Sequence, residues 1–162
     1  MELSQAQIDT AVRLAVAAGF GMLIGIEREI REHAAGLRTH ILVCVGACLF
    51  TIVSAFGFDV VGGDTLRSDP TRVASNIVTG VGFLGAGAIM REGLSVRGLT
   101  TAASLWMVAA IGMAVGLGMY FASGIAVVIT LLSLWVLRPF RRRLRAAVGD
   151  RSDGDYEGRR GS

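Results

Sequence analysis

The stretch HILVCVGACLFTIVSAFGF, residues 40–58, decides the fold class of this chain. After His40 it contains no Asp, Glu, Lys or Arg, and its length is close to the roughly 20 apolar residues that a helix needs to cross a bilayer. We therefore predict a transmembrane helix there. Its two cysteines, Cys44 and Cys48, share one helix face, where we expect them to pack rather than to form a disulfide or bind a metal.

Four further apolar stretches have similar lengths, over residues 10–26, 73–90, 101–117 and 119–137. Hydrophobic residues make up 52% of the chain and charged residues only 18%, against about 25% charged residues in a soluble domain. We predict an all-α fold, a polytopic membrane helix bundle with about five transmembrane helices. Only residues 117–120 can turn between the last two stretches, so one long buried hairpin is an alternative there.

The basic residues are all arginines, and their distribution predicts the orientation. Eight lie from Arg138 onward and most others lie in the first and third predicted loops, whereas the opposite side has Arg67 and Arg72 beside several aspartates. Short cytoplasmic loops carry an excess of Arg and Lys. We predict a bacterial inner-membrane protein with its N-terminus outside and its C-terminus in the cytoplasm. Residues 1–140 form the transmembrane domain, and residues 141–162 form a basic, disordered cytoplasmic tail.

Charged and hydroxyl residues gather at the predicted cytoplasmic ends of the spans. If the first two predicted hairpins pack side by side, these residues meet on one face. One interpretation is anchoring at the interface with mutual salt bridges, and the other is a polar vestibule or a docking surface for a partner. The residues of this predicted cytoplasmic cluster are Glu27, Arg28, Glu29, Arg38, Thr39, Arg97, Thr100 and Thr101.

A second polar motif precedes the third stretch, on the predicted outer side. Asp69 and Pro70 suit the cap and the first position of a helix, and Arg72 and Asn76 follow within two turns. The motif is either a helix start or an outer gate. In the first stretch, Arg13 lies four residues after an aspartate, and we expect it to reach the outer surface.

Glycines are abundant inside the predicted spans, and small residues let membrane helices approach closely. The third stretch is densest in glycine. Tight bundle packing explains this pattern, and a bendable or broken helix that lines a binding or permeation site is the alternative. The glycines that we expect to pack are Gly21, Gly25, Gly80, Gly82, Gly85, Gly87, Gly112 and Gly116.

The chain also contains a faint internal repeat. Gly36-Leu37-Arg38-Thr39 resembles Gly98-Leu99-Thr100-Thr101, and Arg28-Glu29 resembles Arg91-Glu92. Both hairpins would enter the membrane from the same side, which suggests a parallel duplication.

The chemistry of the chain argues against an enzyme. Without lysine there is no phosphate-binding loop of the GxxxxGK type, and no catalytic constellation can be assigned. We expect no cofactor. Because the middles of the spans lack carboxylates, a cation site would have to use Glu27, Glu29, Asp69 or backbone carbonyls, and we assign no metal ligands.

Five stretches together resemble the MgtC/SapB family of bacterial membrane proteins: residues 25–29, 35–40, 69–74, 80–87 and 98–106. The resemblance implies an inner-membrane domain associated with growth in low magnesium and with survival inside host cells. Some family members are similar to regulators that restrain the F-type ATP synthase. Longer members carry a cytoplasmic C-terminal domain, in whose place we expect only the short basic tail here.

We therefore expect a non-enzymatic membrane protein that is linked to magnesium or ion homeostasis and acts through helix contacts. An intrinsic transporter or channel for Mg²⁺ or H⁺ is the alternative, and a module that serves assembly alone is a third. The expected partners are the lipid bilayer, further copies of the chain and another membrane protein such as the ATP synthase. We expect no nucleic-acid partner.

Overall fold

The structure is a computed structural model that describes residues 4–61, 70–93 and 95–135. The chain divides into one compact unit, Met1–Val128, and a second, Ile129–Ser162, of which only residues 129–135 are described. The predicted tail, residues 141–162, lies outside the described residues.

The described chain is helical apart from a small sheet, which confirms the all-α prediction. The helices are α1 (Gln5–Ile30), α2 (Leu37–Val61), α3 (Pro70–Gly87), α4 (Leu99–Gly116) and an unlabelled helix, Tyr120–Trp135. Three helical segments are long and apolar enough to cross a membrane: Gln5–Ile30, Leu37–Ala55 and Leu99–Gly116. A membrane protein is thereby supported, while five passes and the orientation stay predictions.

The last two helices are separate elements. α4 ends at Gly116 and the next helix begins at Tyr120. Between them Gly118 has a φ of +80°, a left-handed conformation that glycine adopts without a steric penalty. The break between the two helices therefore lies within residues 117–120, where the sequence predicted that a turn was possible.

The sequence did not predict the β-hairpin that joins α3 to α4. β1 (Met90–Glu92) pairs antiparallel with β2 (Ser95–Arg97), with Met90 opposite Arg97. All its described residues are exposed. Gly98 follows with a φ of +87°, and a Cβ there would overlap the carbonyl oxygen of Ala88. A glycine is therefore needed where the hairpin meets α4.

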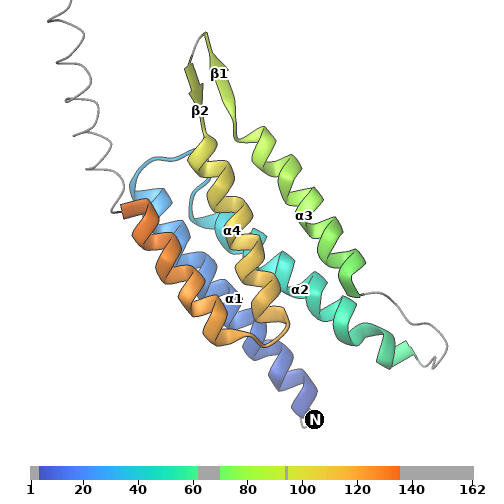
Figure 1. Cartoon of the computed structure of the whole chain (residues 1–162). Coiled ribbons are helices and arrows are strands. Elements are labelled where there is room, and N and C mark those ends of the chain that lie inside the picture. Colours follow the sequence, from blue (N-terminus) through green and yellow to red (C-terminus); the bar gives the residue numbers. More distant parts are fainter. Residues whose placement is uncertain (1–3, 62–69, 94, 136–162) are drawn as a thin grey trace, which may run out of the picture. The chain divides into compact units, whose positions relative to one another are not determined.

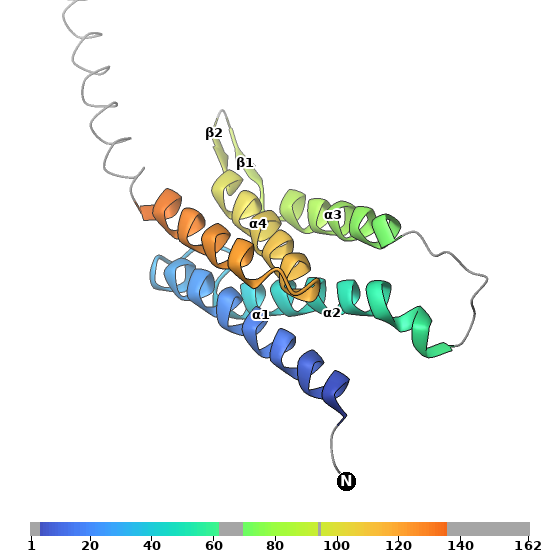
Figure 2. The same ribbon diagram turned by 60° about the horizontal axis from the view of Figure 1, so that its bottom comes forward.

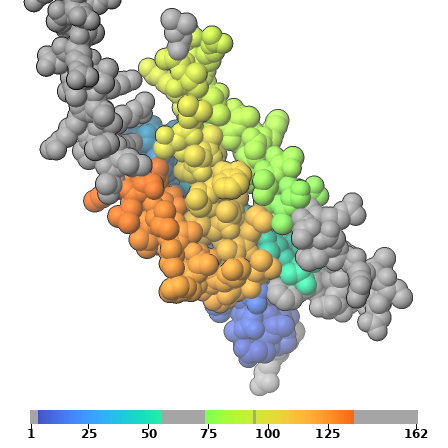
Figure 3. Space-filling view, viewed as in Figure 1, coloured from blue at the N-terminus to red at the C-terminus, as the bar shows by residue number. Residues whose placement is uncertain are grey.

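The core lies where α2 and α4 run side by side, with α1 and α3 on opposite sides of this pair in both ribbon views (Figures 1 and 2). Figure 3 shows α3 as a separate ridge along the flank of α4. Ala47, Val81 and Ala109 form a buried apolar cluster that joins α2, α3 and α4. Both α2 and α4 begin at the leucine of a Gly-Leu pair, three and two residues before the predicted spans, so the two similar segments of the internal repeat begin a helix at the same position.

Candidate functional site

Two glycines of α1 bring its backbone against α2. A Cβ added at Gly21 would lie 2.8 Å from the carbonyl oxygen of His40, and one at Gly25 would lie 2.8 Å from the Cα of Leu37. Distances this short leave no room for a side chain. The first hairpin is therefore a close backbone-to-backbone pair, as glycine ridges allow in membrane helices.

Two glycines of α4 bring its backbone against the other side of α2. A Cβ at Gly112 would overlap the carbonyl oxygen of Cys44, and one at Gly116 would lie 2.8 Å from that of Cys48. The contact moves from Gly112 and Cys44 to Gly116 and Cys48. Residue numbers therefore increase in the same direction along both helices, so α2 and α4 run parallel. The two cysteines are free and buried, in agreement with a packing role.

The glycines of α3 have different surroundings. A Cβ at Gly80, Gly82 or Gly87 would have no neighbour within 4 Å, and one at Gly85 would be at an ordinary 3.5 Å from the Cβ of Ala102. Of the described side chains of α3, only Val81 and Gly85 are buried. The glycine-dense segment is therefore largely open on its outer face.

An apolar groove of about 640 Å³ lies between α2 and α3. Gly46 on α2 and Gly80 on α3 leave space in its walls, and Asn76 is the one amide side chain along it. Asn76 belongs to the predicted outer-side motif, whose other members fall where no side chain is described: Asp69 is outside the described residues, and the side chain of Arg72 is not described. The remaining lining residues are Leu42, Val43, Ala47, Phe50, Ile77, Val81 and Leu84.

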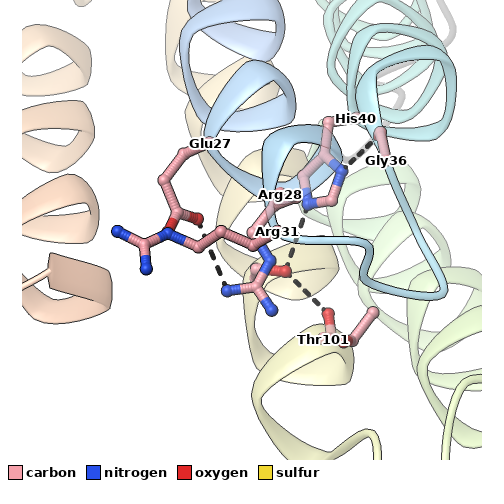
Figure 4. Close-up of polar contacts among 7 residues, drawn as sticks. Glu27, Arg28, Arg31, Gly36, His40 and Thr101 are labelled. Atoms are coloured by element: carbon pink, nitrogen blue, oxygen red, sulfur yellow. Dashed lines mark hydrogen bonds and ion pairs between the residues drawn. The ribbon is translucent and has the colours of Figure 1, made fainter. Parts of the chain in front are cut away.

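A buried polar site lies near the start of α2 (Figure 4). The ring of His40 has no exposed surface. Its Nδ1 is 2.8 Å from the carbonyl oxygen of Gly36, and its Nε2 is 3.1 Å from the hydroxyl of Ser104 on α4. That hydroxyl is also 2.8 Å from the carbonyl oxygen of Thr101. A polar chain thus links α2 to α4 inside the bundle.

Ion pairs from the end of α1 lie beside this chain (Figure 4). Arg28 is 1% exposed, and its Nη1 is 3.5 Å from Oε2 of Glu27. The Nε of Arg31, which is more exposed, is 2.6 Å from Oε1 of Glu27. One buried carboxylate is therefore shared by two guanidinium groups.

The other members of the predicted cytoplasmic cluster have separate roles. Oε2 of Glu29 accepts a hydrogen bond of 2.8 Å from the backbone N–H of Leu37 and so caps α2. Arg97 pairs with Glu92 at 3.3 Å in the exposed hairpin. Arg38 and Thr100 are exposed, and Thr39 is half-buried. Of the eight predicted residues, the structure brings together Glu27, Arg28 and Thr101.

Sequence reasoning missed the residues that complete this site. In the sequence, His40 is the first residue of a predicted span and Ser104 lies inside an apolar stretch. An ionisable residue inside a span is a functional candidate by default, and this is the signal that points to His40. Sequence reasoning also missed that Arg13 donates a hydrogen bond of 2.5 Å to the carbonyl oxygen of Gly116 at the end of α4. Among the described residues, no group of three or more His, Cys, Asp or Glu could hold a metal ion.

The sequence is similar to known proteins over most of its length. The MgtC family matches residues 14–143. The Escherichia coli (strain K12) protein named "Putative magnesium transporter YhiD" is 48% identical over 134 residues, which cover 82% of this chain and 62% of that protein. Protein MgtC of Brucella abortus (strain 2308) is 49% identical over 130 residues, which cover 80% of this chain and 52% of that protein.

Protein MgtC of Salmonella typhimurium (strain 14028s / SGSC 2262) is 44% identical over 133 residues, which cover 82% of this chain and 54% of that protein. The chain thus spans from about half to about three-fifths of the length of these relatives. No solved structure matches it.

Proposed function

The chain belongs to the MgtC family, and on that premise we propose that it is a non-enzymatic membrane protein of magnesium homeostasis that acts through helix contacts with a partner membrane protein. The link to magnesium rests on the name of the Escherichia coli relative. The mode of action rests on the groove between α2 and α3. The proposed setting is the bacterial inner membrane, with five passes, the N-terminus outside and the C-terminus in the cytoplasm.

The open groove is the observation that carries the proposal. Its walls are apolar, and Gly46 and Gly80 leave room for close approach of another backbone. Membrane helices associate through small residues and interhelical hydrogen bonds, because lipid supplies no hydrophobic drive between them. The amide of Asn76 offers both a donor and an acceptor at the groove. These features suit a transmembrane helix that carries small residues and a polar side chain.

The rival function, intrinsic transport of Mg²⁺ or H⁺, has less support from the described residues. Glu27 is the one buried carboxylate among them, and Arg28 and Arg31 already share it. A cation would have to displace two guanidinium groups in order to bind there. The geometry therefore favours a structural ion pair at this position.

Photocrosslinking in native membranes tests the partner. A photoreactive phenylalanine analogue replaces Phe50, which lines the groove and is 62% exposed. The matched control replaces Trp106, which is 49% exposed on α4 and does not line the groove. We expect a crosslinked product with a second protein from position 50 and none from position 106. Gly80→Leu, which fills the groove, should abolish that product.

Two results would contradict the proposal. Crosslinks to further copies of the chain alone would assign the groove to homo-oligomer contacts, and equal products from both positions would mean that the groove has no special role. Purified protein in liposomes gives the second test. Magnesium flux above that of empty vesicles, lowered by Glu27→Gln or Asp69→Asn, would establish the transporter instead.

A further inference from the structure

The β-hairpin between α3 and α4 is exposed on both of its faces. Its strands have three residues each, and every described residue in them is exposed. Figure 1 shows the hairpin projecting beyond the ends of α3 and α4. An isolated two-stranded hairpin is marginally stable at best in water, so the surroundings of this one decide how it is held.

The length of α4 places the hairpin at the surface of the membrane. α4 has 18 residues and is apolar enough over its whole length, Leu99–Gly116, to cross a bilayer. At 1.5 Å per residue it is about 27 Å long, close to the roughly 30 Å of the hydrocarbon core. With α4 across the membrane, Leu99 lies at one edge of the hydrocarbon. Arg97, two residues earlier, then lies in the headgroup layer.

The base of the hairpin carries large apolar side chains beside basic ones. Met90 pairs with Arg97 next to the helices, and Arg91 pairs with Val96 one step further out. The side chains of Met90, Val96 and Leu99 are 58%, 51% and 58% exposed. Arginine stems lie along apolar surface while the charged head reaches polar surroundings. The base of the hairpin therefore suits the boundary between hydrocarbon and headgroups.

The charges of the hairpin are ordered by distance from the helices. Arg97 and Arg91 lie at the first two levels, and Glu92, opposite Ser95, lies at the third. Three strand residues rise about 10 Å, whereas the headgroup layer is about 5 to 8 Å thick on each side. The backbone of the two arginines is therefore at the level of the lipid phosphates, and that of Glu92 is at the outer edge of the layer.

Arg91 is the residue best placed to bind a phosphate group. Its Nε donates a hydrogen bond of 3.1 Å to the carbonyl oxygen of Gly93, which uses one of the five N–H donors of the guanidinium group. Among the described residues Arg91 has no acidic partner, whereas Arg97 pairs with Glu92 at 3.3 Å. A guanidinium group matches two phosphate oxygens with parallel hydrogen bonds.

We propose that the β-hairpin is a membrane-surface element that binds the headgroups of anionic phospholipids, with Arg91 as its main phosphate contact. Two arginines and one glutamate give the hairpin an excess of one positive charge. A basic residue near the surface favours negatively charged lipid by about five-fold. In the predicted orientation the hairpin meets the cytoplasmic leaflet, whose surface is negative. This contact is separate from the groove between α2 and α3.

A second copy of the chain is the rival occupant, because an unpaired strand edge can add another strand. Strands of three residues, against about five to six in a typical strand, offer few backbone hydrogen bonds to such a sheet. Pairing two hairpins would also bring their excess positive charges together, which is unfavourable. The geometry and the charge therefore both favour lipid.

Fluorescence quenching by brominated lipid tests this choice. The full-length protein is placed in nanodiscs of fixed composition, equal parts of phosphatidylglycerol and phosphatidylcholine, with bromine on the chains of one lipid or the other. Ser95→Cys carries the fluorophore, because Ser95 is exposed and the two native cysteines are buried. We expect stronger quenching by the brominated phosphatidylglycerol. Arg91→Gln should lower the ratio of the two quenching efficiencies by up to about five-fold.

Glu92→Gln is the matched control, because it changes the same exposed hairpin by one charge of the opposite sign. The ratio should rise in this variant, and Arg91→Lys should keep most of the native ratio. Equal quenching by the two lipids, or an Arg91→Gln ratio identical to the native one, would overturn the proposal. Disulfide-linked dimers through position 95 as the main product, with weak quenching by both lipids, would assign the hairpin to contact between copies instead.

Discussion

The first two helical hairpins share a plan but use their glycines in opposite ways. In α1–α2, Gly21 and Gly25 let the two backbones touch, whereas in α3–α4 the glycines Gly80, Gly82 and Gly87 face open space. The C-terminal ends of α1 and α3 also differ, in the burial of their charged residues. The end of α1 buries an ion pair against α2 and α4, while the end of α3 continues into an exposed hairpin.

Under the proposed function, this difference separates stability from contact with a partner. Close backbone packing joins α1, α2 and α4, whereas α3 reaches the core mainly through the side chain of Val81. The third helix is buried at Val81 and Gly85 and leaves glycines, Asn76 and large apolar side chains such as Phe83 exposed. Small residues and interhelical hydrogen bonds are what membrane helices use to associate. We propose that, of the two similar hairpins, the first serves mainly the core and the second mainly contact with the partner.

The largest expected effect comes from the ion pairs of the two hairpins. Glu27→Gln leaves Arg28 buried without its carboxylate, and loss of one partner of a buried pair destabilises by about 3 to 5 kcal/mol. Glu92→Gln removes the partner of Arg97 in the exposed hairpin, where such pairs contribute about 0 to 1 kcal/mol. Thermal unfolding of the detergent-solubilised protein compares the two. Equal losses of stability would mean that the ion pairs of the two hairpins do not differ in burial as described.

A smaller effect separates the glycines themselves. Gly112→Ala places a methyl group against the carbonyl oxygen of Cys44, and overpacking of this kind typically costs about 1 to 3 kcal/mol. Gly80→Ala meets no atom within 4 Å, so its free energy of unfolding should be unchanged or slightly increased. The same unfolding assay checks both variants. A Gly80→Ala variant as unstable as Gly112→Ala would show that α3 packs as tightly as α4.

Most of the helical architecture could be predicted from the sequence, because apolar length and glycine spacing act locally. Residues 40–58 indicated a span, and the structure places a helix there, in α2. The glycines predicted to pack in α1 and α4, Gly21, Gly25, Gly112 and Gly116, do lie against the backbone of α2. The sequence predicted only a loop between residues 90 and 101, and so missed the β-hairpin. Arg91 and Glu92 lie in β1, whereas Arg28 and Glu29, which they resemble, lie in α1. Similar short sequences can therefore have different secondary structure in the two hairpins.

The candidate site was harder to predict, because its residues come from three helices. The distance between His40 and Ser104 depends on the register of α2 against α4, which no local pattern reveals. Likewise, the sequence shows Arg13 near the start of α1 but not that Gly116 lies across from it. The sequence also does not distinguish a glycine in open space, such as Gly80, from one packed against another backbone, such as Gly112. The neighbour of a packed glycine is distant in the sequence.

The smallest predicted effect concerns how the second helix of each hairpin begins. α2 is capped by the carboxylate of Glu29 on the N–H of Leu37, while α4 begins after Gly98 with no side-chain cap. Glu29→Ala should lower stability by about 1 kcal/mol, the usual loss of a helix cap, and Thr100→Ala should change it little. Amide hydrogen exchange at the first turn of each helix measures this locally. Faster exchange in α2 for Glu29→Ala, with α4 unchanged in Thr100→Ala, would show that only the first hairpin closes its helix start with a side chain.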